Sequence, residues 1–285
     1  MKANHYRLVA IDLDGTLLCP KGTVTPRTRA AVARAVKAGL RICFATGRSW
    51  RESSRILKEA GHYDSAVFVT GALVIDPRKR KTLHRRLMGP QLAREVADFF
   101  HERGQTVLAL QDAQQAGVDY LVTESGTLNP CTRQWVKMAR SRVKRHGGLG
   151  GHDAHEHTLR VSIVADGADV ERCRRDLLAI FGPRVAWQDL VVPSTGARVL
   201  EVFEPGVNKW TGVMHVAGLH GIEPGQIVAV GDDANDVPMI RDAGLGVAMG
   251  NARQPALSAA KRVIGHNAAD GLAEFLEELV EGRGD

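Results

Sequence analysis

The sequence predicts an α/β fold, with a Rossmann-like parallel sheet flanked by helices and a separate α+β module inserted into the chain. Apolar runs of strand length alternate with helical patterns at the start of the chain, and the alternation resumes after residue 193. Strands that alternate with helices form right-handed βαβ units and therefore a parallel sheet. Between about residues 77 and 193 the pattern changes to a mixed series of helices and strands, which predicts the module.

The strands expected in the parallel sheet are short apolar runs, which are typical of strands covered on both faces. They lie at residues 8–11, 40–44, 67–69, 199–202 and 227–230. The first helix has clear boundaries: Thr25 suits the N-cap, Pro26 the first turn, Val32 and Val36 one face, and Gly39 the C-terminal stop. Further helices around this sheet are expected at residues 49–60, 208–217, 236–242 and 272–280.

The inserted module is expected to form a small domain of its own. Its helices are expected near residues 92–100, through Trp135 and at 170–177, and its strands at 107–110, 120–122 and 161–164. We therefore expect a core domain made of residues 1–81 and 194–285, and a cap domain made of residues 82–193.

The composition is that of an ordinary globular protein. The chain has 285 residues, of which 44% are hydrophobic and 25% charged, enough for one large domain or two modest ones. No run approaches the roughly 18 consecutive apolar residues of a membrane helix. The N-terminus leads directly into a strand without the pattern of a signal peptide, so we expect a cytoplasmic protein with no membrane partner.

Charge and cysteine content argue against a nucleic-acid binder and against a fold held by zinc or disulfides. The net charge of +6 is spread along the chain, although residues 78–81 are all basic, and aromatic residues make up only 5%. Because single-strand binders add stacking aromatics to a basic groove, we expect no nucleic-acid partner. The four cysteines are widely spaced with no Cys-x-x-Cys, so neither a zinc site nor a disulfide framework is indicated.

A loop rich in glycine and histidine lies near the middle of the chain. Residues 147–151 lack the third glycine of a dinucleotide-binding loop, which favours a flexible loop. Four histidines accompany it, at His146, His152, His155 and His157. They have no neighbouring cysteine and no helical register, so a metal site is the less favoured interpretation.

Two carboxylates stand directly after the first expected strand. Asp12 and Asp14 follow the apolar run 8–11 and precede Gly15. Open α/β sheets bind ligands at the carboxyl ends of their strands, and alternate side chains of an extended segment share one face. Both acids could therefore act on one reacting centre, one attacking and the other moving protons. The alternative is a turn in which Asp and Gly only serve the bend.

Three further features at expected strand ends suit phosphate chemistry. Thr46, Gly47 and Arg48 offer a hydroxyl and backbone N–H groups near a helix start, where anions bind. Lys209 stands in the first turn of a helix, where a cation is poorly placed for the helix dipole, so a negative ligand is indicated. Residues 231–236 (Gly-Asp-Asp-Ala-Asn-Asp) add more acids after the last strand. Each feature alone has an ordinary interpretation, but their order along the strand ends favours one site.

The acids of this site would repel one another. Two unit charges ~4 Å apart cost about 4 kcal/mol at an effective dielectric constant of about 20. A cation must therefore balance Asp12, Asp14, Asp232 and Asp236. Carboxylate oxygens without nitrogen or sulfur ligands favour Mg²⁺, which also accepts water and phosphate oxygens.

Residues 12–16, residues 46–48, Lys209 and residues 231–236 together resemble the four motifs of the haloacid dehalogenase-like hydrolases. The likeness is specifically to the Cof-type phosphatases, which carry an inserted C2-type cap. The resemblance covers essentially the whole chain, and a set of four motifs is highly specific. It implies that family's fold for the core and a substrate-selecting role for the cap.

The resemblance also implies roles for the acids. Asp12 would be the nucleophile that forms an aspartyl-phosphate, and Asp14 the general acid/base. Mg²⁺ would be held by Asp12, the backbone carbonyl of Asp14, and Asp232, with Asp236 assisting. Asp14 would then lend the metal its backbone oxygen and keep its carboxylate for proton transfer.

The remaining motif residues are implied to hold the substrate. Thr46 and Lys209 would bind the transferring phosphoryl group, with Gly47, Arg48 and Asn235 completing the phosphate and substrate contacts. One departure is visible, because residues 70–72 read Thr-Gly-Ala where these phosphatases usually carry Asn-Gly-Ala.

The expected function is hydrolysis of a small phosphorylated metabolite, of the sugar phosphate class, with Mg²⁺. An alternative within the enzymes is phosphoryl transfer to another sugar, as in a phosphomutase. An alternative from another class is a signalling receiver that stores the phosphoryl group. Substrate contacts are expected from cap loops within residues 111–117 and 119–129, and the protein is expected to be a monomer or homodimer.

Overall fold

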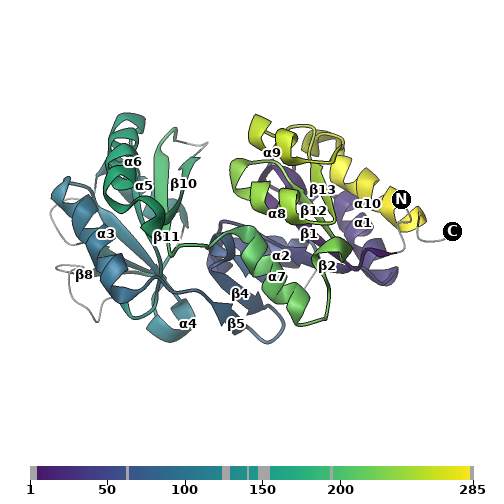
Figure 1. Cartoon of the computed structure of the whole chain (residues 1–285), viewed down its shortest axis with the longest axis horizontal. Coiled ribbons are helices and arrows are strands. Elements are labelled where there is room, and N and C mark those ends of the chain that lie inside the picture. Colours follow the sequence, from purple (N-terminus) through teal and green to yellow (C-terminus); the bar gives the residue numbers. More distant parts are fainter. Residues whose placement is uncertain are drawn as a thin grey trace. The chain divides into compact units, whose positions relative to one another are not determined.

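The computed structural model describes residues 5–61, 64–123, 129–139, 141–146, 155–192 and 195–282, without the side chains of residues 138 and 139. The chain forms two compact units (Figure 1). The first unit combines Met1–His84 with Asn208–Asp285, and the second is Arg85–Val207. An inserted module is thus present, and its C-terminal limit lies beyond the expected residue 193.

A five-stranded parallel sheet forms the centre of the first unit, in the order β14-β13-β12-β1-β2. The strands are β1 (Leu8–Ile11), β2 (Arg41–Phe44), β12 (Ile227–Gly231), β13 (Leu245–Ala248) and β14 (Arg262–Val263). Leu8 pairs in register with both Arg41 and Ile227. The ends of β1, β2 and β12 therefore meet at one edge of the sheet, as the sequence predicts.

Helices cover this sheet and connect its strands. They are α1 (Pro26–Lys37), α2 (Trp50–Glu59), α7 (Lys209–Gly218), α8 (Val237–Asp242), α9 (Gln254–Ala259) and α10 (Gly271–Glu281). The Thr25 N-cap is confirmed, because its side chain accepts a hydrogen bond from the Thr28 N–H. Val32 is buried as expected, but Val36 is 43% exposed, because the buried face of α1 continues through Ala35 instead.

A small antiparallel sheet extends the first unit. Its strands are β3 (Ala66–Phe68), β4 (Leu73–Asp76) and β5 (Lys81–Arg85), in that order. The apolar run expected as a parallel strand at residues 67–69 is therefore shifted by one residue. It contacts the parallel sheet through a bridge between Ala45 and Val67 and otherwise pairs antiparallel with β4.

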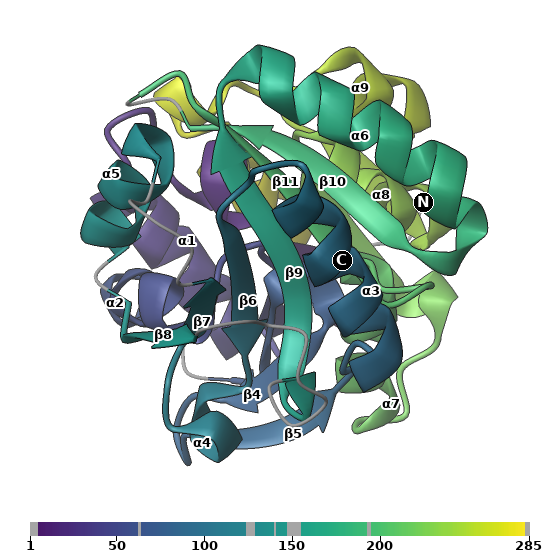
Figure 2. The ribbon, with the colours of Figure 1, turned by 90° about the vertical axis from the view of Figure 1, so that its left-hand side faces the viewer.

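The second unit has a six-stranded sheet of its own, in the order β10-β11-β9-β6-β7-β8. The strands are β6 (Val107–Gln111), β7 (Tyr120–Thr123), β8 (Val143–His146), β9 (Thr158–Ala165), β10 (Ala186–Val191) and β11 (Arg198–Phe203). Helices α3 (Pro90–Glu102) and α6 (Gly167–Phe181) lie over one face of this sheet (Figure 2). The unit also contains α4 (Ala113–Ala116) and α5 (Pro130–Ala139). Its apolar core is built from α3, α6 and the strands beneath them.

The expectation that residues 199–202 form a strand of the parallel sheet is wrong. They belong to β11, which lies between β9 and β10 in the second unit and is antiparallel to both. The short connection between β10 and β11, residues 192–197, allows only an antiparallel pair, because parallel neighbours need a long crossover. An apolar run shows that a strand is buried, but it does not show in which sheet.

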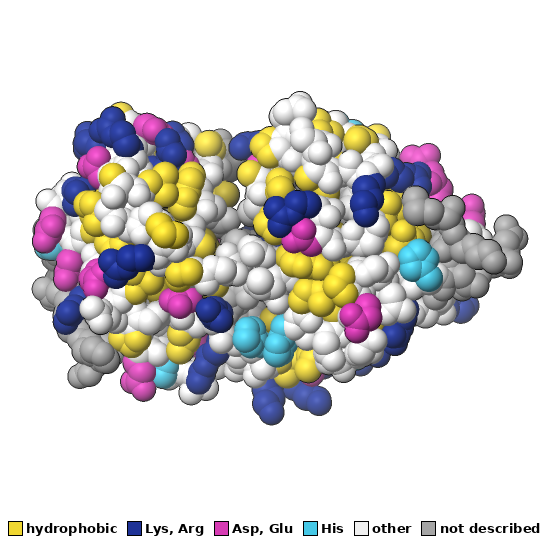
Figure 3. All heavy atoms as spheres, viewed as in Figure 1, with side chains coloured by type: hydrophobic (Ala, Val, Ile, Leu, Met, Phe, Trp, Pro, Cys, Tyr) yellow, Lys and Arg dark blue, Asp and Glu magenta, His cyan; other side chains and the backbone are white. Residues whose placement is uncertain are grey.

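Other expectations about the chain can be compared with the described residues. All four cysteines are free thiols. His146 ends β8, and buried His155 shares a hydrogen bond with Thr158, while His152 and residues 147–151 lie outside the described residues. No helix in the described ranges combines the length and apolar character needed to cross a lipid bilayer. Acidic and basic side chains are interspersed on the face shown in Figure 3.

Candidate active site

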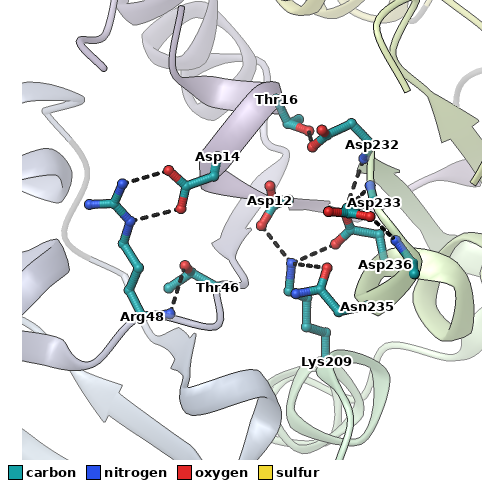
Figure 4. A network of polar contacts seen from close by, with 11 residues as sticks. Asp12, Asp14, Thr16, Thr46, Arg48, Lys209, Asp232, Asp233, Asn235 and Asp236 are labelled. Carbon is teal, nitrogen blue, oxygen red and sulfur yellow. Dashed lines mark hydrogen bonds and ion pairs between the residues drawn. The ribbon is translucent and has the colours of Figure 1, made fainter. Parts of the chain in front are cut away.

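The end of β1 carries the first site residue. Asp12 is 3% exposed, and its backbone N–H donates to the Val230 carbonyl, which ties it to β12. Its Oδ1 accepts a 2.6 Å hydrogen bond from Lys209 Nζ (Figure 4). Burial raises the pKa of Asp12 well above its usual value. Lys209 opposes that rise, and the neighbouring acids Asp236 and Asp232 add to it.

Lys209 is the cation at the centre of the site. It is the first residue of α7, which Asn208 caps through the Thr211 N–H. Its Nζ lies 2.6 Å from oxygens of both Asp12 and Asp236 and 3.2 Å from Asn235 Oδ1. Burial alone would lower the pKa of Lys209, but Asp12 and Asp236 raise it above its usual value. The lysine therefore stays charged at the start of α7, where the sequence predicts that it faces negatively charged groups.

Asp232 and Asp236 lie at the end of β12 and differ in their surroundings. Asp232 Oδ1 accepts a 3.0 Å hydrogen bond from the Thr16 hydroxyl. Burial and the nearby Asp236 raise the pKa of Asp232 to about 7. Asp236 uses one oxygen for Lys209 and the other for the backbone N–H groups of Asp232 and Asp233. Asp236 therefore fixes the loop after β12, while Asp232 remains the less engaged carboxylate.

The acids converge closely enough to hold a cation. One oxygen each from Asp12, Asp232 and Asp236 lie within 4.8 Å of one another, the only such group within the described ranges. All three donors are carboxylate oxygens, which is the donor chemistry of Mg²⁺. Burial raises the pKa values of Asp12 and Asp232, and the neighbouring acids raise them further, so a divalent cation here would relieve an electrostatic cost. The Asp14 side chain is not part of this group.

Asp14 instead faces Arg48, an arrangement that sequence reasoning missed. Arg48 Nε donates to Asp14 Oδ2 at 2.7 Å, and Arg48 Nη2 donates to Asp14 Oδ1 at 2.5 Å. In Figure 4 the Asp14 carboxylate points to the Arg48 side of the site, away from Lys209. The Asp14 side chain is 55% exposed, so it remains accessible from solution. Arg48 was expected at the substrate, and here it holds the acid in a two-bond ion pair.

Thr46 and Gly47 form the turn after β2. Thr46 is buried, its N–H donates to the Val67 carbonyl, and its hydroxyl oxygen accepts from the Arg48 N–H at 3.1 Å. The expectation of available backbone N–H groups here is therefore not met at Thr46 and Arg48. The bond from Arg48 uses only a lone pair of the Thr46 hydroxyl oxygen, so the hydroxyl can still donate its proton to another acceptor. Gly47 lies between Thr46 and Arg48, three residues before α2 begins at Trp50.

The segment after β3 packs against the start of α7. Val69 and Thr70 have left-handed φ values of 52° and 55°, which β-branched residues rarely adopt. Gly71 follows with φ 105°, and a Cβ there would overlap the Asn208 carbonyl. Asn tolerates a left-handed conformation better than Thr does. Thr70, which stands where these phosphatases usually carry Asn, therefore introduces backbone strain next to the start of α7, which carries Lys209.

Comparisons with known proteins identify a family and relatives that match nearly the whole chain. The family described as haloacid dehalogenase-like hydrolase matches residues 9–276. The 5-amino-6-(5-phospho-D-ribitylamino)uracil phosphatase YitU of Bacillus subtilis is 28% identical, over 98% of each chain. The HMP-PP phosphatase of Serratia proteamaculans is 27% identical, over 95% of this chain and 94% of its own. A solved structure, a haloacid dehalogenase-like hydrolase from Bacteroides thetaiotaomicron, has a TM-score of 0.79 at 22% identity, covering 96% of this chain and 99% of that one.

Proposed function

The chain belongs to the haloacid dehalogenase-like hydrolases and is a phosphatase, and we propose that it hydrolyses a small phosphorylated metabolite with Mg²⁺. The proposed chemistry passes through an aspartyl-phosphate on Asp12. The observation that carries this proposal is the buried Asp12 carboxylate, bonded to Lys209 and placed within one acidic group with Asp232. A buried cation and a cluster of carboxylates at one sheet edge suit a phosphate dianion and a divalent metal together.

In the proposed mechanism Asp12 attacks phosphorus and Asp14 moves protons. Lys209 neutralises charge on the phosphoryl oxygens, and the Thr46 hydroxyl donates to one of them. Mg²⁺ held by Asp12, Asp232 and the backbone carbonyl of Asp14 would supply the remaining positive charge. Asp14 gives a proton to the leaving alkoxide and then takes one from the water that hydrolyses the acyl phosphate.

Arg48 is assigned a part in this mechanism through Asp14. Its two hydrogen bonds fix the direction of the Asp14 carboxylate. Arg48 Nη1 takes no part in this ion pair, so the guanidinium can meet an anionic substrate, as the resemblance implies, while it still holds Asp14.

The substrate class is proposed as a sugar phosphate or a similarly polar small phosphate. Relatives that match nearly the whole chain are named for action on phosphorylated ribitylaminouracil and on HMP-PP, both small phosphorylated metabolites. The second unit, Arg85–Val207, is proposed as the cap that selects the leaving group. Of the cap loops expected to contact substrate, residues 124–128 lie outside the described residues.

Hydrolysis is favoured over the two alternatives named from the sequence. Family membership favours an enzyme over a signalling receiver, and an acid two residues beyond the nucleophile suits rapid hydrolysis of the acyl phosphate. Transfer to a second sugar would give a phosphosugar isomer instead of free phosphate, so product analysis distinguishes the two enzymes.

The test is turnover of p-nitrophenyl phosphate with Mg²⁺, with chelator, and in the Asp12→Asn variant. Loss of the nucleophile should lower kcat at least about a thousandfold. The matched control is Asp233→Asn, a neighbouring acid that caps the next turn, and it should keep kcat within about threefold. Activity that survives both chelation and Asp12→Asn would contradict the proposed mechanism.

A further inference from the structure

The loop after β13 lies against the strand ends that carry the acids. The Met249 N–H donates to the Gly231 carbonyl at 3.0 Å, and the Arg253 N–H donates to the Asp232 carbonyl at 2.8 Å. We call residues 249–253 the bracing loop. Its backbone thus fixes the main chain on both sides of the bond that joins Gly231 to Asp232.

Asn251 is the side chain through which the bracing loop reaches the loop after β1. Its Nδ2 donates to the Gly15 carbonyl at 2.8 Å, and its Oδ1 accepts from the Asn267 N–H at 2.9 Å. Asn267 in turn donates from its side chain to the Leu18 carbonyl at 2.8 Å. A carboxamide can donate at one end and accept at the other, which neither Asp nor Leu of similar size can do.

The Gly15 peptide that Asn251 holds is also in close contact with Asp232. Gly15 has a φ of 79°, and a Cβ at this position would overlap the Asp232 carboxylate. The next residue, Thr16, donates its hydroxyl to Asp232 Oδ1. Rotation of the Gly15 carbonyl away from Asn251 would move Thr16 from Asp232 and turn the adjoining main chain of Asp14.

We propose that Asn251 is a positioning residue of this phosphatase, acting through Gly15. It holds the Asp14–Thr16 main chain in the register that places Thr16 on Asp232, and the same stretch of main chain carries the Asp14 carbonyl that the proposed function assigns to the cation. The proposal rests on the proposed function for its link to phosphate hydrolysis. Its geometry is independent of that function, because Gly15, Asp232 and the bracing loop belong to one unit.

The effect should fall on metal binding and kcat. Partners that orient metal-binding groups typically contribute about 10- to 100-fold in metal affinity or activity. Asn251 lies outside the acidic group of Asp12, Asp232 and Asp236, so KM should change little. A merely structural residue would instead lower the thermal midpoint without changing the metal affinity of the folded protein.

The experiment uses the full chain and three variants, Asn251→Leu, Asn251→Asp and the matched control Asn267→Leu. Mn²⁺ affinity is measured by electron paramagnetic resonance titration, alongside the Mg²⁺ dependence of p-nitrophenyl phosphate turnover and the thermal midpoint. Both Asn251 variants should weaken Mn²⁺ binding and lower kcat by about tenfold or more, with KM within about twofold. Asn267→Leu should keep the Mn²⁺ affinity within about threefold of wild type. It removes only the hydrogen bond to the Leu18 carbonyl, which lies beyond Thr16 in the loop after β1.

Asn251→Asp separates hydrogen bonding from charge. A new carboxylate would attract a cation, so weaker Mn²⁺ binding in this variant reports the lost donation to Gly15. It also keeps the bond from the Asn267 N–H, and it carries the test if Asn251→Leu does not fold. Unchanged Mn²⁺ affinity in Asn251→Asp, or an equal loss in the Asn267 control, would overturn the proposal. Wild-type protein that binds Mn²⁺ but hydrolyses no phosphomonoester would overturn the proposed function, while the Mn²⁺ titration would still decide the role of Asn251.

Discussion

Lys209 carries the buried positive charge that Asp12 and Asp236 share at the centre of the site. A lysine in the first turn of a helix is unfavourable for the helix dipole, so its position in the sequence indicated a negative partner. In the structure the partners are Asp12 and Asp236, whose oxygens both lie 2.6 Å from its ammonium nitrogen. The Arg48–Asp14 pair could not be predicted in the same way, because both side chains are long enough or exposed enough to take other directions.

Removing the Lys209 charge should therefore destabilise the protein as well as inactivate it. Lys209→Met leaves Asp12 and Asp236 buried without their cation, and breaking a buried pair in this way costs about 3–5 kcal/mol. The loss should shrink at lower pH, where Asp12 can be protonated. Urea unfolding in the presence of chelator measures it, with Lys58→Met on the exposed side of α2 as a control that stays within about 0.5 kcal/mol. A Lys209 variant as stable as this control at pH 8 would contradict the ion-pair account.

Asp232 predicts a pH dependence of stability in metal-free protein. Its pKa is raised to about 7 in the folded chain, mainly by burial, above the unfolded value of 3.8. The folded state then binds more protons than the unfolded state between these values, so this group's stability contribution is present below pH 3.8 and lost as pH rises through 7. Thermal midpoints measured with chelator should fall less over this range in Asp232→Asn than in wild type. Identical pH profiles for the two proteins would show that Asp232 does not titrate in this way.

At the scale of elements, the sequence predicted best where an apolar run ended in distinctive residues. β1, β2 and β12 were anticipated almost to the residue because each is buried along all or nearly all of its length and is followed by a motif. β10 was missed because its residues are only partly buried and Trp187 is 38% exposed. β13 was missed because Gly246 interrupts it, and the close approach of the Ile240 carbonyl that requires this glycine is visible only in the structure.

The contact between the segment after β3 and α7 gives a prediction of its own. Gly71→Ala would place a methyl group onto the Asn208 carbonyl, at a φ that also disfavours alanine. We expect displacement of the α7 N-terminus, with a loss of about 2 kcal/mol in stability and a reduced kcat because Lys209 moves. The matched control is Gly218→Ala at the other end of α7, where a Cβ meets nothing within 4 Å. Equal kinetics for the two variants would mean that this contact does not position the lysine.

At the level of the whole chain, the two units are joined at two points, after His84 and after Val207. The chain re-enters the first unit at Asn208, directly before Lys209. The sequence predicted an inserted module but placed its C-terminal limit at 193, because β11 reads equally well as a strand of either sheet. Each unit nevertheless has a core of its own, as the change of pattern along the chain predicted.

Metal binding should slow hydrogen exchange in the first unit and leave the second unit unchanged. Mg²⁺ at about 100 times its dissociation constant should stabilise the folded protein by about 2.7 kcal/mol. Hydrogen exchange should then slow in peptides that cover residues 12–18 and 231–236, with the strand β9 of the second unit unchanged. Slowing confined to the second unit would place the cation outside the acidic group.

The proposed mechanism requires Asp12 to carry the phosphoryl group during turnover. Rapid acid quench of the wild-type protein acting on p-nitrophenyl phosphate, followed by borodeuteride reduction, converts an aspartyl-phosphate to a deuterated homoserine that peptide mass spectrometry can locate. We expect this label at position 12 and at no other aspartate. Label at Asp14 or Asp232, or steady turnover with no label at position 12, would contradict it.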